Sequence, residues 1–246
     1  HGYNTAVGYV AGAAMTTAIN NTLIGASAGD ALTTGGDNVA VGSGALTGQE
    51  SGNSNVAIGR NAMAQGTATD RNVAIGYFSL NNLSFSGDSY NVAVGYNAGL
   101  SVTTGTSNTL IGGLSGDAIT TGIDNVVLGY NALSTEDTGS RSVAIGREAL
   151  RDQNYDGSAY NVAIGYQAGK LVTTGTYNIA LGAESLAGNN VTGIYNIAIG
   201  YRAGYNISSG DKNIAIGHNA LKTEDANNGN IAIGYLALED LNAGAD

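Results

Sequence analysis

The sequence predicts an all-β protein, a parallel β-solenoid of about fourteen 17-residue coils. A five-residue cassette, Asn-x-x-(Val/Ile/Leu)-Gly, recurs fourteen times through the 246 residues, mostly at 17-residue steps. The chain has 39 Gly and no Pro, which excludes collagen because a collagen helix needs a Gly-X-Y period with Pro. Hydrophobic residues make up 43% and follow the repeat, which argues against disorder. One short unit stacked on itself explains these observations together.

The middle of each cassette is expected to form a short strand. In residues 92–94, Val92 and Val94 flank Ala93, a period-2 pattern with β-branched residues on one face. The central position is Ala in eleven of the fourteen cassettes. Because a face of small residues needs a close neighbour, we expect it to contact another chain. The predicted interface residues are Ala6, Leu23, Ala40, Ala57, Ala74, Ala93, Leu110, Val127, Ala144, Ala163, Ala180, Ala198, Ala215 and Ala232.

The first and last residues of the cassette have distinct expected roles. Asn opens thirteen of the fourteen cassettes, and Ser142 is the exception. Stacked coil on coil, these Asn side chains are expected to form a hydrogen-bonded amide ladder. Gly closes every cassette, and it lets the chain turn sharply out of the strand because it tolerates positive φ.

The second half of each coil comes in two kinds. Four residues after the cassette Gly stands either another Gly, as at Gly29, or a large apolar residue, as at Leu46. In the Gly kind, an apolar residue such as Leu32 follows three positions later, before a Thr-Thr or Ser-Ser pair. We expect each coil to bury one extra apolar side chain opposite the cassette strand. Seventeen residues with frequent Gly leave no room for a stable helix.

Two stretches carry a family resemblance, NIAIGYRAG at 196–204 and NNTLIGASAGDALTTGGDNVAVG at 20–42. They resemble the head repeats of trimeric autotransporter adhesins and related repeats of phage tail-fibre and bacterial surface proteins. The resemblance covers nearly the whole chain. It implies a left-handed β-roll in a homotrimer, with Val and Ile inside each roll and Ala toward the three-fold axis. The 17-residue period and the Tyr in the turns depart from the adhesin pattern. We expect residues 1–246 to be a single repeat domain, a segment of a longer fibrous protein.

Charge and composition exclude several classes of function. The chain has 19 acidic and 9 basic residues and a net charge of −10, which disfavours nucleic acid because phosphate neutralisation needs clustered Lys and Arg. No window approaches 18 uninterrupted apolar residues, so no membrane insertion is expected. With no Cys and two His, no catalytic constellation is found, and we expect neither an enzyme nor a cofactor.

Metal binding is not expected either. Acidic pairs occur at Glu136-Asp137 and Glu224-Asp225, but a hard-cation site needs six or more oxygen ligands. We therefore interpret both pairs as solvated turns. His218 is interpreted as a surface turn residue.

Tyr and Thr patterns leave two readings open. Seven Tyr directly follow a cassette Gly, and they are expected to staple neighbouring coils rather than to form a stacking platform for sugars. They are Tyr9, Tyr77, Tyr96, Tyr130, Tyr166, Tyr201 and Tyr235. Thr-Thr pairs such as Thr33-Thr34 would suit an ice-binding face, but more than half of the coils lack them.

Two coils are longer by two residues, at 81–90 and 151–160. Insertions in solenoids often form the binding face, and aromatics beside Asp and Asn suit a glycan. The candidate ligand residues are Phe85, Asp88, Tyr90, Tyr155, Asp156 and Tyr160. The sequence thus predicts a non-enzymatic, extracellular fibre segment on a cell or virion surface, attaching to a host receptor or glycan. Alternatives are a passive or filament-forming spacer, an ice-binding solenoid, and a fibre domain joined to a hydrolase elsewhere.

Overall fold

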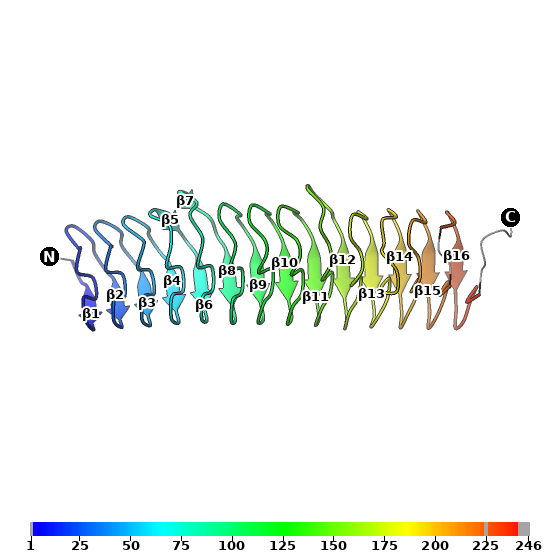
Figure 1. Ribbon diagram of the computed structural model, residues 1–246, viewed down its shortest axis with the longest axis horizontal. Helices are drawn as coiled ribbons and strands as arrows, with labels where there is room; N and C mark the ends of the chain where they lie inside the picture. The colour runs from blue at the N-terminus through cyan, green and yellow to red at the C-terminus, as the bar shows by residue number, and fades with distance from the viewer. Residues whose placement is uncertain (1, 224–225, 241–246) are drawn as a thin grey trace. The chain divides into compact units, whose positions relative to one another are not determined.

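The computed structural model describes residues 2–223 and 226–240 and is an all-β parallel β-solenoid of about 13 turns (Figure 1). No helix occurs in these two ranges. Each of the fourteen cassettes forms a three-residue strand, so the predicted strands are confirmed. The chain groups into two compact units, residues 1–124 and 125–246, and each is described by itself.

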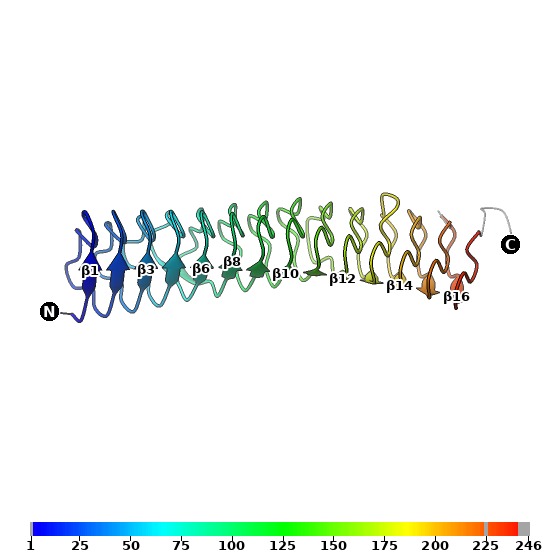
Figure 2. The ribbon, with the colours of Figure 1, turned by 90° about the horizontal axis from the view of Figure 1, so that it is seen from below.

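In the first unit, seven cassette strands stack in parallel, each on the next: β1 (Thr5–Val7), β2 (Thr22–Ile24), β3 (Val39–Val41), β4 (Val56–Ile58), β6 (Val73–Ile75), β8 (Val92–Val94) and β9 (Thr109–Ile111). The second unit stacks β10 (Val126–Leu128), β11 (Val143–Ile145), β12 (Val162–Ile164), β13 (Ile179–Leu181), β14 (Ile197–Ile199), β15 (Ile214–Ile216) and β16 (Ile231–Ile233). Within each unit, successive cassette strands lie side by side (Figure 2). Equivalent cassette positions pair directly, as Ala57 does with Ala74.

The predicted Asn ladder is confirmed and is buried. Asn55 shows the pattern: its main-chain N–H donates to Oδ1 of Asn38 at 2.9 Å, and its Nδ2 donates to the carbonyl of Thr69 at 2.7 Å. Asn72 in turn donates its N–H to Oδ1 of Asn55 at 3.0 Å. Each rung therefore satisfies buried polar groups of two turns at once, as polar groups shielded from solvent require.

The cassette Gly is required by the close stacking of turns. Gly25 has φ of +140°. A Cβ at Gly25 would lie 2.5 Å from the carbonyl oxygen of Gly42 in the next turn. Both the conformation and the contact with a main-chain atom thus exclude a side chain at this position.

The prediction of which strand face points inward is wrong. Thirteen of the fourteen central residues are buried inside the chain's own solenoid, and Ala6 in the first turn is the exposed one. The flanking β-branched residues point outward, as in β4, where Ala57 is buried and Ile58 is 36% exposed. The predicted interface residues, Leu23, Ala40, Ala57, Ala74, Ala93, Leu110, Val127, Ala144, Ala163, Ala180, Ala198, Ala215 and Ala232, therefore belong to the core.

The physical reason for the reversal is the thinness of each turn. Large side chains enter the interior from the side opposite the strand, such as the fully buried Leu46 and Met63, and leave room only for a small residue, Ala in most turns, at the cassette centre. Where that centre is Leu23, the opposite position is Gly29, and a Cβ there would lie 3.0 Å from a methyl carbon of Leu23. The two positions thus fill one volume between them.

The expectation of one extra buried apolar residue per coil is confirmed for all coils except the first and the last, where Met15 is half-buried and Leu238 is exposed. In coils of the Gly kind, Leu32, Val102 and Ile119 are buried. In coils of the other kind, the residue in the Gly position, such as Leu46, is buried and adopts a left-handed conformation with φ of 55°. The position three residues later, which is apolar in coils of the Gly kind, can then be polar. Glu136 and Gln153 occupy this position at the candidate site.

Candidate functional site

In the first inserted turn, residues 81–90, charged and aromatic side chains bond to one another and to the preceding turn. Its backbone extends the stack through a small parallel pair, β5 (Thr69–Asp70) and β7 (Gly87–Asp88). Tyr90 donates its hydroxyl to Oδ2 of Asp88 at 2.9 Å, and Arg71 bonds to Oδ1 of Asp88. The Arg71 guanidinium also lies 5.8 Å from the Tyr90 ring centre, and Phe85 is half-buried. The side chains of Asp88, Tyr90 and Arg71 therefore satisfy one another.

The second inserted turn instead borders a surface depression. A hollow of about 490 Å³ is lined by Asp137, Asn154, Tyr155, Asp156 and Thr174. These residues come from three successive turns of the second unit, with the inserted turn in the middle. Oδ1 of Asp156 accepts a hydrogen bond of 2.8 Å from the hydroxyl of Thr138, which fixes one edge of the hollow. Tyr155 is 36% exposed, so part of its ring is accessible.

A buried polar network lies beneath this depression, where the Asn ladder is interrupted. Ser142 replaces the ladder Asn, and the side chain of Gln153 fills the place of the missing amide. Nε2 of Gln153 donates to Oγ of Ser142 and to Oε2 of Glu136, both at 2.9 Å, and Oε1 accepts from Nδ2 of Asn161 at 2.9 Å. All four residues are buried. The ladder thus continues through Gln153 to the next Asn.

Glu136 is the charged member of this network. Its Oε1 accepts from the amide of Gly139 at 2.8 Å, and its Oε2 accepts from Gln153 and from the amide of Tyr155 at 3.3 Å. Burial raises the pKa of Glu136, partly offset by these hydrogen bonds to its charged form. The interpretation of Glu136 as a solvated turn residue is therefore wrong, and Glu224-Asp225 lies outside the described residues.

The predicted ligand residues thus fall into three groups. Tyr155 and Asp156 meet at the depression. Phe85, Asp88 and Tyr90 belong to the inserted turn of the first unit, and Tyr160 does not line the depression but stacks on Tyr177. Sequence reasoning missed Asp137, Asn154, Thr174 and the buried pair Glu136 and Gln153. The signal was available, since Ser142 alone breaks the Asn pattern and a buried ladder demands a replacement donor.

Exposed aromatic rings form stacked rows along the second unit. Tyr160, Tyr177 and Tyr195 stack at centroid distances of 5.0 and 4.9 Å, with the Arg141 guanidinium 5.8 Å from the Tyr160 ring. A parallel case in the first unit is Tyr77 on Tyr96, 5.6 Å apart. Rings that stack on one another cover each other's faces, the surfaces that a sugar would need.

His218 joins a row of the same kind. Its ring lies 5.3 Å from that of Tyr201 and 5.2 Å from that of Tyr235, and it is exposed. These contacts agree with the prediction that the Tyr residues after the cassette Gly staple neighbouring coils. They also agree with a surface role for His218.

The outward face of the cassette strands is uncharged in both units and aliphatic apart from Thr5, Thr22 and Thr109 in the first. The two outward positions of every cassette strand are at least partly exposed, and none carries a charge. In the second unit they are Val126, Leu128, Val143, Ile145, Val162, Ile164, Ile179, Leu181, Ile197, Ile199, Ile214, Ile216, Ile231 and Ile233. Monomeric proteins rarely expose so continuous an apolar strip.

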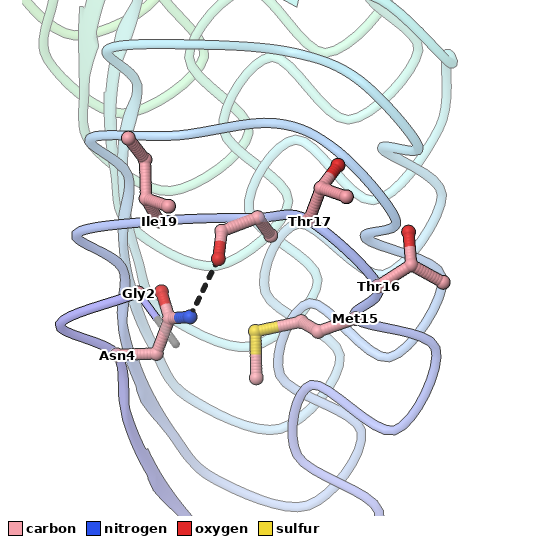
Figure 3. Close-up of a pocket in the computed structure, with 7 residues that line it drawn as sticks. Gly2, Asn4, Met15, Thr16, Thr17 and Ile19 are labelled. Carbon is pink, nitrogen blue, oxygen red and sulfur yellow. Dashed lines mark hydrogen bonds between the residues drawn. The ribbon is translucent and has the colours of Figure 1, made fainter.

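A second hollow, of about 460 Å³, lies at the open mouth of the first turn. It is lined by Gly2, Asn4, Met15, Thr16, Thr17, Ala18 and Ile19 (Figure 3). Nδ2 of Asn4 donates to the carbonyl of Ala18 at 2.7 Å, as a ladder residue does, and none of the described residues that line this hollow is ionisable.

Across the described ranges, no group of three or more metal-ligating side chains is found. Those ranges also hold no helix long and apolar enough to span a bilayer. Comparison of the chain with protein-family models, characterised proteins and solved structures finds no match.

Proposed function

We propose that the protein is a non-enzymatic fibre segment that attaches to a glycan receptor through the depression at its second inserted turn. The observation that carries this is the composition of the hollow. It combines the accessible ring of Tyr155 with two carboxylates, an amide and a hydroxyl. An aromatic ring packs against the apolar face of a sugar, while carboxylate and amide groups bond its hydroxyls.

The first inserted turn provides the matched control for this proposal. Asp88 and Tyr90 have the same chemistry but are bonded to each other and to Arg71. On a glycan array, Tyr155→Ala with Asp156→Ala should abolish binding, because both the stacking and the hydrogen-bonding groups are lost. Phe85→Ala with Asp88→Ala should leave binding unchanged. Equal loss in both double variants, or none in either, would refute the assignment.

We further propose that the chain acts as a left-handed homotrimer on a cell or virion surface. Three copies are the number that the resemblance to trimeric adhesin and tail-fibre repeats implies. Support comes from the uncharged aliphatic strip on the outward strand face, which parallel copies would cover in a closed cyclic assembly. The contact residues would then be Ile164 and Ile199 and their equivalents, in place of the buried Ala residues.

Solution mass tests the trimer directly. Wild type should scatter light as three chains, and Ile164→Lys with Ile199→Lys should scatter as one, because the charges would be buried at the contact. Gln167→Lys, at a half-buried side chain off the strand face, should keep the wild-type mass. A monomeric wild type would contradict the assembly.

A passive spacer is the second candidate. Two observations favour it. At the first inserted turn, Asp88 and Tyr90 bond to each other, and in the second unit Tyr160, Tyr177 and Tyr195 stack on one another. In both places, groups that could bind a partner are already in contact with other residues of the chain. A fibre without any glycan ligand but with trimeric mass would support it. An ice-binding face has less support, since the Thr33 hydroxyl donates to the carbonyl of Glu50 in the next turn.

A further inference from the structure

The main chain of the second inserted turn is held from below by one carboxylate. Oε2 of Glu136 accepts a hydrogen bond of 3.3 Å from the main-chain amide of Tyr155. It accepts a second bond, of 2.9 Å, from Nε2 of Gln153, two positions earlier in the chain. Between them, the amide of Asn154 donates to the carbonyl of Thr173 at 3.0 Å. Of the residues that line the depression, Tyr155 is thus the one whose main chain Glu136 anchors.

All three groups that point at the Glu136 carboxylate are N–H donors. They are the amides of Gly139 and Tyr155 and Nε2 of Gln153, whose Oε1 is already bonded to Asn161. This arrangement suits an ionised carboxylate and offers no acceptor to a protonated one. On protonation, one oxygen would become a donor facing a donor. The contact that gives way is the longest one, to Tyr155.

We propose that Glu136 is the positioning residue of the depression, and that its protonation releases the main chain at Tyr155. The site would then be assembled at neutral pH and loosened in mild acid. The consequence for attachment rests on the proposed glycan function, whereas the release of the main chain does not.

The other charges around Glu136 in the second unit do not neutralise it. Asp137, next in sequence, adds repulsion, and Asp156 on the inserted turn is a second carboxylate nearby. Arg141, at the end of the same turn, bonds to Ser158. In the following turn, Arg147 pairs with Glu148 at 3.3 Å, and Arg151 bonds to Asp152 at 2.6 Å. Among the described residues, no cation is one of the groups that shift the pKa of Glu136.

Hydrogen exchange at the Tyr155 amide tests the positioning role without a ligand. Protection factors, corrected for the intrinsic pH dependence, would be measured by NMR on the full chain from pH 7.5 down to about pH 4.5. Wild type should lose about tenfold protection at Tyr155 across this range, equivalent to about 1.4 kcal/mol. Glu136→Gln should lack the protection throughout, and Glu184→Gln, at a surface ion pair with Arg202, should match wild type.

Constant protection of Tyr155 in wild type across the range would overturn the proposal, even if Glu136→Gln failed to fold. A glycan-array measurement at both pH values separates the two hypotheses. If Tyr155 is released in acid but no glycan binds at either pH, the glycan function fails and the positioning role stands. If a glycan binds wild type and Glu136→Gln equally at both pH values, the positioning role fails and the glycan function stands.

Discussion

Gln153 donates a hydrogen bond of 2.9 Å to Glu136, seventeen residues earlier, at the one rung where the Asn ladder has a Ser. The contact joins two features that are separate in the sequence, an irregular rung and an inserted turn. It makes the buried interior and the surface depression of the second unit interdependent.

Gln153→Leu should destabilise the second unit more than its lost contacts suggest. The change leaves the Ser142 hydroxyl, one Asn161 amide hydrogen and part of the Glu136 carboxylate unpaired in the interior. Each such group costs about 1–3 kcal/mol, so we expect a loss of at least about 3 kcal/mol in urea unfolding. Gln167→Ala removes a more exposed bond to Glu148 and should cost less than about 1 kcal/mol. Comparable losses for the two variants would contradict the network.

A regular rung should be costly to remove as well. Asn196 donates to Asn178 and to the carbonyl of Gly210, and accepts from the amide of Asn213. The bond to Asn178 is donated by the main-chain N–H and survives in Asn196→Ala, but the carbonyl of Gly210 and the amide of Asn213 lose their partners. We therefore expect a loss of about 2–4 kcal/mol by chemical denaturation. Asn189→Ala, which removes one half-buried bond to Asn206, serves as the comparison and should cost about 1 kcal/mol.

Neighbouring residues of one strand should respond in opposite ways to a change of size. Ala180 is buried opposite Leu186, so Ala180→Leu should overpack the interior and cost about 1–3 kcal/mol. Leu181 points outward, and Leu181→Ala should cost under about 1 kcal/mol when measured below the concentration at which chains associate. The reverse order would mean that Ala faces outward after all.

The stability difference between wild type and Glu136→Gln should change with pH in a defined direction. Burial raises the pKa of Glu136 above its unfolded value. Its contribution is therefore fully present below the unfolded pKa and is lost as the pH rises through the folded pKa. Because protonation removes a buried charge, we expect the free energy of global unfolding of wild type, relative to that of Glu136→Gln, to rise as the pH falls from 7 through that raised pKa, in parallel urea titrations. This global gain is distinct from the local opening proposed at the Tyr155 amide, which hydrogen exchange measures. A difference that is independent of pH would show that Glu136 keeps an ordinary pKa.

Much of the architecture could be predicted because the repeat carries it. The cassette fixed the strand positions, the Gly turns and the Asn ladder, each by a local rule. The inward face was missed although its signal was present. In a strand, residues two apart share a face, so Asn55 and Ala57 must point the same way. Because the Asn ladder is buried, the Ala residues on the same strand face are buried with it.

The candidate site was predicted only in part, for a different reason. Tyr155 and Asp156 stood out because the insertion breaks the period. Asp137 and Thr174 join them from turns above and below, and only the stacking register brings these residues together. Glu136 looked like a surface acid because sequence does not tell which turn residues the solenoid encloses.

At Ser142, where Gln153 takes the place of the missing ladder Asn, the turns of this chain could not be exchanged freely. A regular turn such as 21–37 presents the same ladder chemistry to both neighbours, so it could be duplicated or removed as an independent module. The stretch 136–161 could not, because Glu136, Ser142, Gln153 and Asn161 contribute to one network from successive turns. A recombinant that cut this stretch would separate a charge from its donors, so it must be transplanted whole.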